Sequence, residues 1–237
     1  DYVPGNLAGA LVLRLADGMV HRVEIGYLIT GVGRAQVFSR GTFASLIGVA
    51  TAQAFTWRDG IHAEPAGSRM RTFPLDGVDR PAMTIGSTEH YALPRLAEPR
   101  GLPEVDVYLG WFGSATRALH LSSRLTPVLL QLPGARSLVR RIGEFAQRRV
   151  AEEPDPVALA RVVPHFIGTA YDASGTALAE VHLASGEPYQ LTADLLAWGA
   201  QRAAEDGVSR PGALGPVEAF GLNGLETAAI EVGLRRL

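Results

Sequence analysis

VFSRGTFAS, residues 37–45, links a predicted strand to a predicted helix, and the rest of the chain is organised around this link. Before it, residues 23–29 alternate in character, with Val23, Ile25, Tyr27 and Ile29 on one face and Glu24, Gly26 and Leu28 on the other. After it, residues 44–54 are rich in alanine and predict a helix. The chain therefore passes from a sheet to a helix through a segment of small and hydroxyl-bearing residues.

Five of these linking residues are candidates for binding a ligand: Ser39, Arg40, Gly41, Thr42 and Ser45. The first N–H groups of a helix have no partner within the helix, and the helix dipole favours an anion there. A substrate carbonyl or a cofactor phosphate could therefore bind at this point. The alternative is that Ser39 or Thr42 caps the helix and Gly41 forms the turn, which is the more frequent role of such residues.

Composition excludes several classes of function. The net charge is −2 and the arginines are scattered, so we expect no nucleic-acid partner. No apolar run has the roughly 20 residues that span a bilayer, and no signal peptide is visible, which predicts a cytoplasmic protein without a transmembrane segment. The chain has no cysteine and all 22 basic residues are arginine, so thiolate, Cys-ligated zinc and lysine Schiff-base chemistry are excluded.

The order of the predicted elements indicates an α+β fold. Residues 20–30, 61–86, 103–110 and 164–183 are expected to form a mixed, mainly antiparallel sheet covered by helices. Hairpins are predicted at Asp59-Gly60, at Asp76-Gly77 and at residues 172–175. Further helices are predicted over residues 7–16, 117–131, 134–150, 192–206 and 225–234. We expect one domain over residues 1–237, with linker composition at residues 152–156.

Residues 87–91 carry the densest polar chemistry and are expected at the end of a strand: Ser87, Thr88, Glu89, His90 and Tyr91. Imidazole titrates near neutral pH, and a neighbouring carboxylate would raise its pKa, so His90 is a candidate proton donor. Glu89 and Tyr91 are candidates beside it, and Tyr27 is another acid. A structural hydrogen-bonding role is the alternative for each. The histidines show no i, i+4 pairing or carboxylate cluster, so no metal site is expected.

Several stretches, taken in order, resemble one enzyme family. They are residues 1–8 (DYVPGNLA), 41–45 (GTFAS), 87–90 (STEH) with Leu93-Pro94, 108–113 (YLGWFG) and 215–221 (GPVEAFG). Their order and spacing are similar to those of the saccharopine dehydrogenase-like oxidoreductases, in particular the branch of the trans-acting enoyl reductases of actinobacterial lipid synthesis. The resemblance implies a Rossmann half that binds NAD(P), followed by an α+β half that holds the substrate and forms a dimer.

This chain departs from the family at the nucleotide site. Gly31-Val32-Gly33-Arg34 lacks the third glycine of a Rossmann fingerprint and leads into Gln36-Val37-Phe38. We therefore expect residues 1–237 to be the substrate and dimerisation half, without the Rossmann half and without tight NAD(P) binding of their own. The missing half would be part of a longer protein or a separate chain.

Two functions of different class follow. The first is the substrate-binding half of an NAD(P)-dependent oxidoreductase acting on a small, lipid-like or acyl molecule, with a proton supplied from residues 87–91. The second is a non-catalytic dimerisation or ligand-binding module. In the first case, Ser39–Thr42 and Ser87–Tyr91 are expected to face one cleft.

Overall fold

The computed structural model describes residues 2–31, 37–51, 54–123, 137, 141, 143, 145, 147–150 and 152–237. Its helices are α1 (Val3–Leu15), α2 (Arg40–Thr51), α3 (Glu89–Leu96), α4 (Ala115–Ser123), α7 (Pro156–Leu159), α8 (Pro188–Glu205), α9 (Pro216–Phe220) and α10 (Leu222–Glu231). Its strands are β1 (Arg22–Thr30), β2 (Phe55–Arg58), β3 (Ile61–Ala63), β4 (Met70–Leu75), β5 (Val78–Thr84), β6 (Glu104–Gly110), β7 (Val163–Tyr171), β8 (Ala177–Ala184) and β9 (Arg235–Arg236).

The nine described strands form one sheet: seven follow the order β3-β2-β6-β1-β7-β8-β9, and off this path β5 pairs with β6 and β4 with β5. β1 and β6 run parallel, and the other described pairs are antiparallel. β6 pairs with β2 near its beginning and with β5 near its end. The predicted α+β class with a mainly antiparallel sheet is confirmed. All three predicted hairpins are present, and Asp76 and Gly77 have the positive φ angles of a tight turn.

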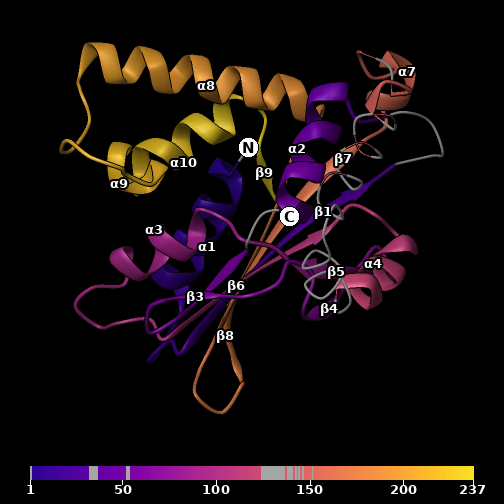
Figure 1. The fold of residues 1–237 in the computed structure, drawn as a ribbon. Coiled ribbons are helices and arrows are strands. Elements are labelled where there is room, and N and C mark those ends of the chain that lie inside the picture. Colours follow the sequence, from indigo (N-terminus) through magenta and orange to yellow (C-terminus); the bar gives the residue numbers. More distant parts are fainter. Residues whose placement is uncertain are drawn as a thin grey trace.

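One face of the sheet is covered by helices. α1 packs on β1, β7 and β8, and α9 and α10 pack on α1 (Figure 1). α8 lies along the top of Figure 1, above α10. The odd-numbered residues of β1 face this layer, so Val23, Ile25 and Tyr27 join the main core as their alternation predicts.

α1 is the central helix of this layer. Residues 4–12 are all buried, whereas the sequence predicted an amphipathic helix over residues 7–16. Small residues allow the close packing, since a Cβ on Gly168 of β7 would lie 3.0 Å from the carbonyl oxygen of Ala8. α1 is therefore enclosed between the sheet and the C-terminal helices.

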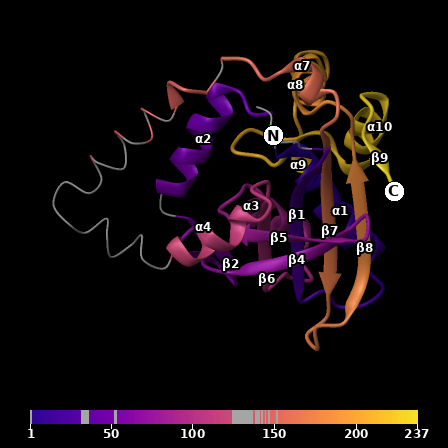
Figure 2. The same cartoon turned by 90° about the vertical axis from the view of Figure 1, so that its right-hand side faces the viewer.

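The opposite face of the sheet is covered by the β4–β5 hairpin. Phe73 and Leu75 from β4 pack with Leu28, Tyr108 and Ile167 in a second apolar cluster. Two buried carboxylates beside this cluster are paired with arginines: Asp106 with Arg58 and Arg69, and Glu24 with Arg22 and Arg71. Figure 2 shows β7 and β8 side by side, with α2 at the other side of the molecule from α10.

Several element boundaries differ from their prediction. α2 begins at Arg40 and α8 at Pro188, each about four residues earlier than expected, because capping groups stand before them. α9 lies within residues 212–221, which were expected to be a loop. Pro156, placed in the predicted linker, begins α7. α4 shows the start of the helix predicted over 117–131, but residues 124–136, 138–140, 142, 144 and 146 of the two predicted helices lie outside the described residues.

Candidate functional site

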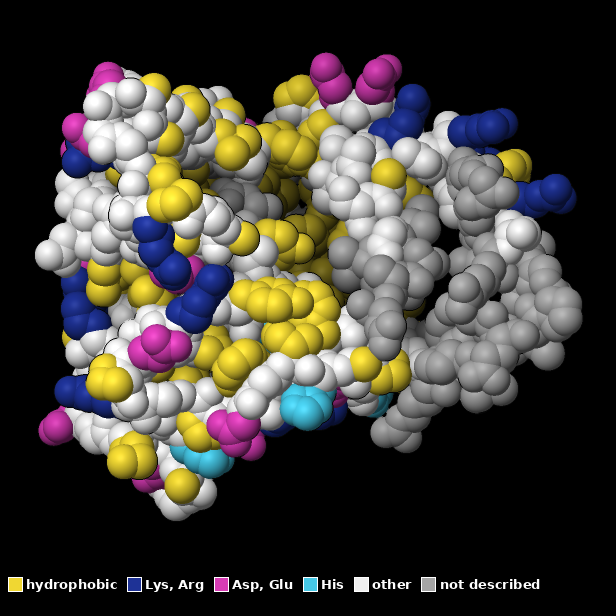
Figure 3. Space-filling model, turned by 60° about the vertical axis from the view of Figure 1, so that its left-hand side comes forward, with side chains coloured by type: hydrophobic (Ala, Val, Ile, Leu, Met, Phe, Trp, Pro, Cys, Tyr) yellow, Lys and Arg dark blue, Asp and Glu magenta, His cyan; other side chains and the backbone are white. Residues whose placement is uncertain are grey.

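A pocket of about 160 Å³ lies where four elements end or begin. It is formed by the end of β1, the start of α2, the start of β7 and the start of α8. Its walls are mostly apolar and aromatic, and Figure 3 shows a hollow walled by hydrophobic side chains on this side of the molecule. The lining residues are Tyr27, Leu28, Ile29, Val37, Phe38, Thr42, Trp111, Val162, Pro164, Phe166, Pro188, Tyr189, Leu191 and Thr192.

One end of the pocket carries a cluster of three hydroxyl groups, those of Ser39, Thr42 and Tyr189. The Thr42 hydroxyl lies 3.0 Å from the Ser39 hydroxyl and 3.0 Å from the Tyr189 hydroxyl. The N–H of Ser39 donates to the Tyr189 hydroxyl at 2.8 Å, and the N–H of Thr42 donates to Ser39 Oγ at 3.1 Å. Ser39 is thus the N-cap of α2, and the hydroxyls of Thr42 and Tyr189 also line the pocket.

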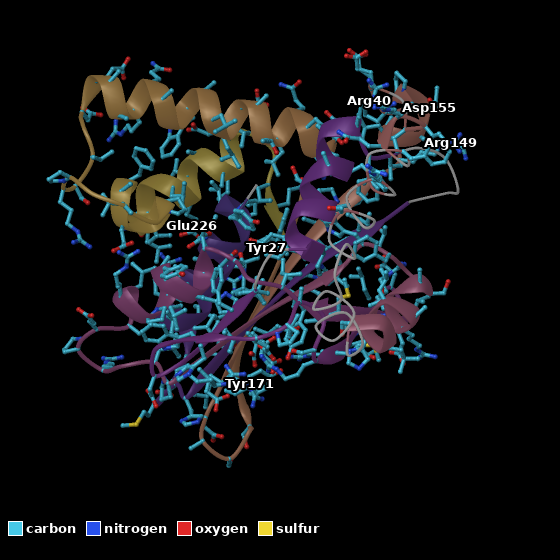
Figure 4. The ribbon with its side chains drawn as sticks, viewed as in Figure 1. Tyr27, Arg40, Arg149, Asp155, Tyr171 and Glu226 are labelled. Carbon is cyan, nitrogen blue, oxygen red and sulfur yellow. The ribbon has the colours of Figure 1, made fainter. Side chains whose placement is uncertain are left out.

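The other residues predicted with them lie elsewhere. The Arg40 Nε donates to the carbonyl of Val150, and in Figure 4 its side chain lies near Asp155 and Arg149, away from Tyr27. Gly41 is exposed, and the Ser45 hydroxyl donates back to the Gly41 carbonyl within α2. The structure therefore places Thr42 at the pocket, with Ser39 behind it, and Arg40, Gly41 and Ser45 outside it.

Ser87 and Glu89 are buried and, with the exposed Thr88, belong to a hydrogen-bond network around the Glu89 carboxylate. Ser87 and Tyr27 each donate a hydrogen bond to this carboxylate, which has no exposed surface. Burial raises the pKa of Glu89, and burial next to Glu89 raises the pKa of Tyr27 well above its ordinary value. Thr88 accepts a hydrogen bond from the Asn6 amide at 3.0 Å. These contacts join α3 to α1 and β1.

His90 and Tyr91 differ from their expected setting. His90 is 1 % exposed, and its Nδ1 lies 3.0 Å from the carbonyl oxygen of Ser87. Burial lowers the pKa of His90 to about 4, whereas we expected the neighbouring carboxylate to raise this pKa. The Glu89 side chain is directed at Tyr27 instead. Tyr91 is 45 % exposed, with its ring beside Phe55.

Residues 87–91 follow the end of β5 after a short segment, but the sequence did not predict that Glu89 begins α3. None of these five residues is among the described residues that line the pocket. Their connection to the pocket is Tyr27, which lines the pocket and donates a hydrogen bond to Glu89. Tyr27 therefore links the Glu89 network to the pocket that Thr42 lines, and residues 87–91 do not line this pocket.

Sequence reasoning missed Tyr189, Trp111 and Phe38. Phe38 and Trp111 stack with ring centroids 5.6 Å apart and form one wall of the pocket. Tyr189 comes from the start of α8, 147 residues after Thr42. A Pro after a carboxylate, Glu187-Pro188, is typical of a helix start and could have placed Tyr189 in the first turn of α8. No sequence pattern could have placed that turn beside α2.

Among the described residues, no group of three or more His, Asp or Glu side chains is arranged to hold a metal ion. His165 and His182 come together, with Nδ1 of His165 2.9 Å from Nε2 of His182, on the sheet face opposite the pocket. None of the described helices combines the length and the apolar character needed to cross a membrane.

Comparison with known proteins gives no family assignment. No protein-family model matches the chain, and a search of curated proteins finds no significant match. The resemblance to the saccharopine dehydrogenase-like oxidoreductases therefore stays a prediction from the sequence.

Proposed function

We propose that this domain is the substrate-binding part of an NAD(P)-dependent oxidoreductase of the saccharopine dehydrogenase-like family, and that it holds a lipid-like or acyl substrate. The observation that carries the proposal is the pocket, whose apolar and aromatic walls end at the hydroxyls of Thr42 and Tyr189. Such a combination suits a ligand with a hydrocarbon body and one polar group. The wider family assignment rests on the order of the sequence motifs.

We propose further that this domain does not itself hold the phosphates of a dinucleotide, and the start of α2 supports this. A Rossmann site needs a glycine-rich turn that runs directly into a helix whose first N–H groups are free. Here the N–H groups of Ser39 and Thr42, before and within the first turn of α2, are already bonded to Tyr189 and Ser39. NAD(P) would accordingly bind to the nucleotide-binding half of the enzyme, and this domain would orient the substrate and exclude water from it.

One observation favours the second function, a ligand-binding module without catalysis. The pocket-lining residues include no histidine, aspartate or glutamate among the described residues, and His90 is buried in another part of the domain. A proton donor for a reduction, other than the hydroxyls of Tyr27 and Tyr189 that line the pocket, would then have to come from the nucleotide-binding half.

Filling the pocket tests the proposal. Thr192→Phe places a ring in the pocket, and Ala193→Phe, at the next position of α8, places the same ring on an exposed site. We expect a medium-chain methyl ketone, followed by tryptophan fluorescence, to bind the wild type and Ala193→Phe equally and Thr192→Phe at least tenfold more weakly. Equal binding by all three proteins would locate the ligand elsewhere.

Calorimetry of residues 1–237 tests the cofactor part. We expect no heat of binding for NADH or NADPH at millimolar concentration. Micromolar binding by this domain alone contradicts the proposal that the nucleotide site lies in another half.

A further inference from the structure

The polar groups at the pocket surface can be counted one by one. The Thr192 hydroxyl donates to the Pro188 carbonyl at 2.9 Å, so its hydrogen is used. The Tyr27 hydroxyl is used by Glu89. Trp111 offers an indole N–H, which can donate but not accept. Apart from this indole N–H, the remaining side-chain polar groups among the described lining residues are the hydroxyls of Thr42 and Tyr189, with Ser39 behind them.

The hydroxyl cluster has one hydrogen more than its internal bonds require. Ser39, Thr42 and Tyr189 carry three O–H hydrogens. The two contacts between hydroxyls, at 3.0 Å each, use two of these hydrogens whichever oxygen donates. The N–H groups of Ser39 and Thr42 donate to the oxygens of Tyr189 and Ser39, so these two N–H groups already have acceptors within the cluster. One O–H of the cluster is left over, and when Thr42 or Tyr189 carries it, this hydrogen can donate to a ligand in the pocket.

The pocket carries no charge to receive an ionised ligand. Every described residue that lines it is uncharged. Arg40, the nearest arginine in sequence to Thr42 among the described residues, is turned toward Val150. Burying a carboxylate in such a pocket would remove its hydration without supplying a cation, and this carries a large penalty.

We propose that the pocket selects molecules whose polar group is an uncharged oxygen function, a carbonyl or a hydroxyl, and discriminates against the corresponding carboxylates. Thr42 and Tyr189 are the specificity-determining residues, because they supply the hydrogen bond to that oxygen. The inference rests on the proposed function, since it names the substrate class of the same pocket.

Three ligands of equal chain length separate the inference from the proposed function: heptane, 2-heptanone and heptanoate at pH 7. Each is titrated into the wild type and into the double variant Thr42→Val/Tyr189→Phe, with tryptophan fluorescence as the readout. The double variant removes the hydroxyls of Thr42 and Tyr189 and changes the size of the pocket little. Thr42→Ser, which keeps a hydroxyl, is the conservative control, and the melting temperature of each variant establishes that it is folded.

We expect the wild type to bind 2-heptanone at least a hundredfold more tightly than heptanoate. The double variant should bind 2-heptanone about tenfold more weakly than the wild type and heptane within about twofold, in keeping with the loss of one hydrogen bond. Thr42→Ser should retain ketone binding. Heptanoate binding as tight as that of the ketone, or equal weakening of heptane and ketone in the double variant, overturns the inference alone. If heptane and the ketone both fail to bind the wild type, the proposed function is overturned with it.

Discussion

The buried carboxyl group of Glu89 holds side chains next to the pocket, including that of Tyr27. Its oxygens accept from Tyr27 and Ser87, so three side chains from β1, α3 and the segment before α3 share one buried polar centre. Gly5 of α1 lies against this centre, and a Cβ there would overlap the Tyr27 hydroxyl and the Glu89 carboxylate. Only a residue without a side chain lets α1 pass at this point.

Gly5→Ala should therefore lower the free energy of unfolding, by about 2 kcal/mol, because overpacking costs more than the gain of about 1 kcal/mol in helix propensity. The matched substitution is Gly224→Ala in α10, where no atom lies near the added Cβ. This control should raise the free energy of unfolding by about 0.5–1 kcal/mol. Urea unfolding of both variants measures the difference, and a stabilised Gly5→Ala protein would mean that α1 and Glu89 have more room than the structure gives them.

At the scale of elements, the pocket depends on the first turn of α8. Glu187 caps this helix, since its carboxylate accepts from the N–H groups of Tyr189 and Gln190 at 2.8 Å each. The same turn holds Tyr189 against the start of α2. The cap of α8 thereby helps to position the Tyr189 hydroxyl, which lines the pocket and is hydrogen-bonded to the start of α2.

Glu187→Ala should lower the free energy of unfolding by about 1 kcal/mol and weaken ketone binding several-fold, because the first turn of α8 loses its cap. Asp155→Ala removes a cap of the same kind from α7, where Asp155 accepts from the N–H groups of Val157 and Ala158. This control should leave ketone binding unchanged. Urea unfolding and fluorescence titration give the two quantities, and unaltered affinity in Glu187→Ala would show that Tyr189 is positioned by α2 alone.

Elements and turns that depend on neighbouring residues alone could be predicted from the sequence. The alternation along β1 and the Asp-Gly turns predicted the strands, the hairpins and the α+β class correctly. The helix that begins at Glu89 was not predicted, because the polar character of residues 87–91 hid it. The pocket could not be predicted, since Thr42, Trp111 and Tyr189 meet through sheet order and helix packing, which no local pattern contains. Of the predicted site residues, the structure places Thr42 at the pocket and Ser39 next to it.

At the scale of the whole molecule, two buried histidines should control stability in acid. His90 lies on the helical side of the sheet and His165 on the side of the β4–β5 hairpin. Burial lowers the pKa of each to about 4 from an ordinary 6.5, and the neighbouring His182 also lowers that of His165. Between these pH values the unfolded chain binds more protons than the folded protein, so stability falls as the pH decreases from 6.5 to 4.

His90→Gln and His165→Gln should each reduce this pH dependence of the unfolding free energy by about 1.4 kcal/mol per pH unit within that window. The effects should add in the double variant, because the two histidines lie on different faces of the sheet and share no partner among the described residues. Urea unfolding between pH 4 and 7 measures the slopes. Unchanged slopes in both single variants would mean that the histidines become protonated without loss of the fold.

Because α9 and α10 help to enclose α1, this helix cannot be fully buried until they have been synthesised. α1 is synthesised about 200 residues before α9 and α10, which pack on it. At about 5–20 residues per second, the apolar helix waits roughly 10–40 s for its cover. During synthesis it would be a binding segment for chaperones that recognise exposed apolar chain, and nascent chains that stop before Pro216 should be targets for proteolysis.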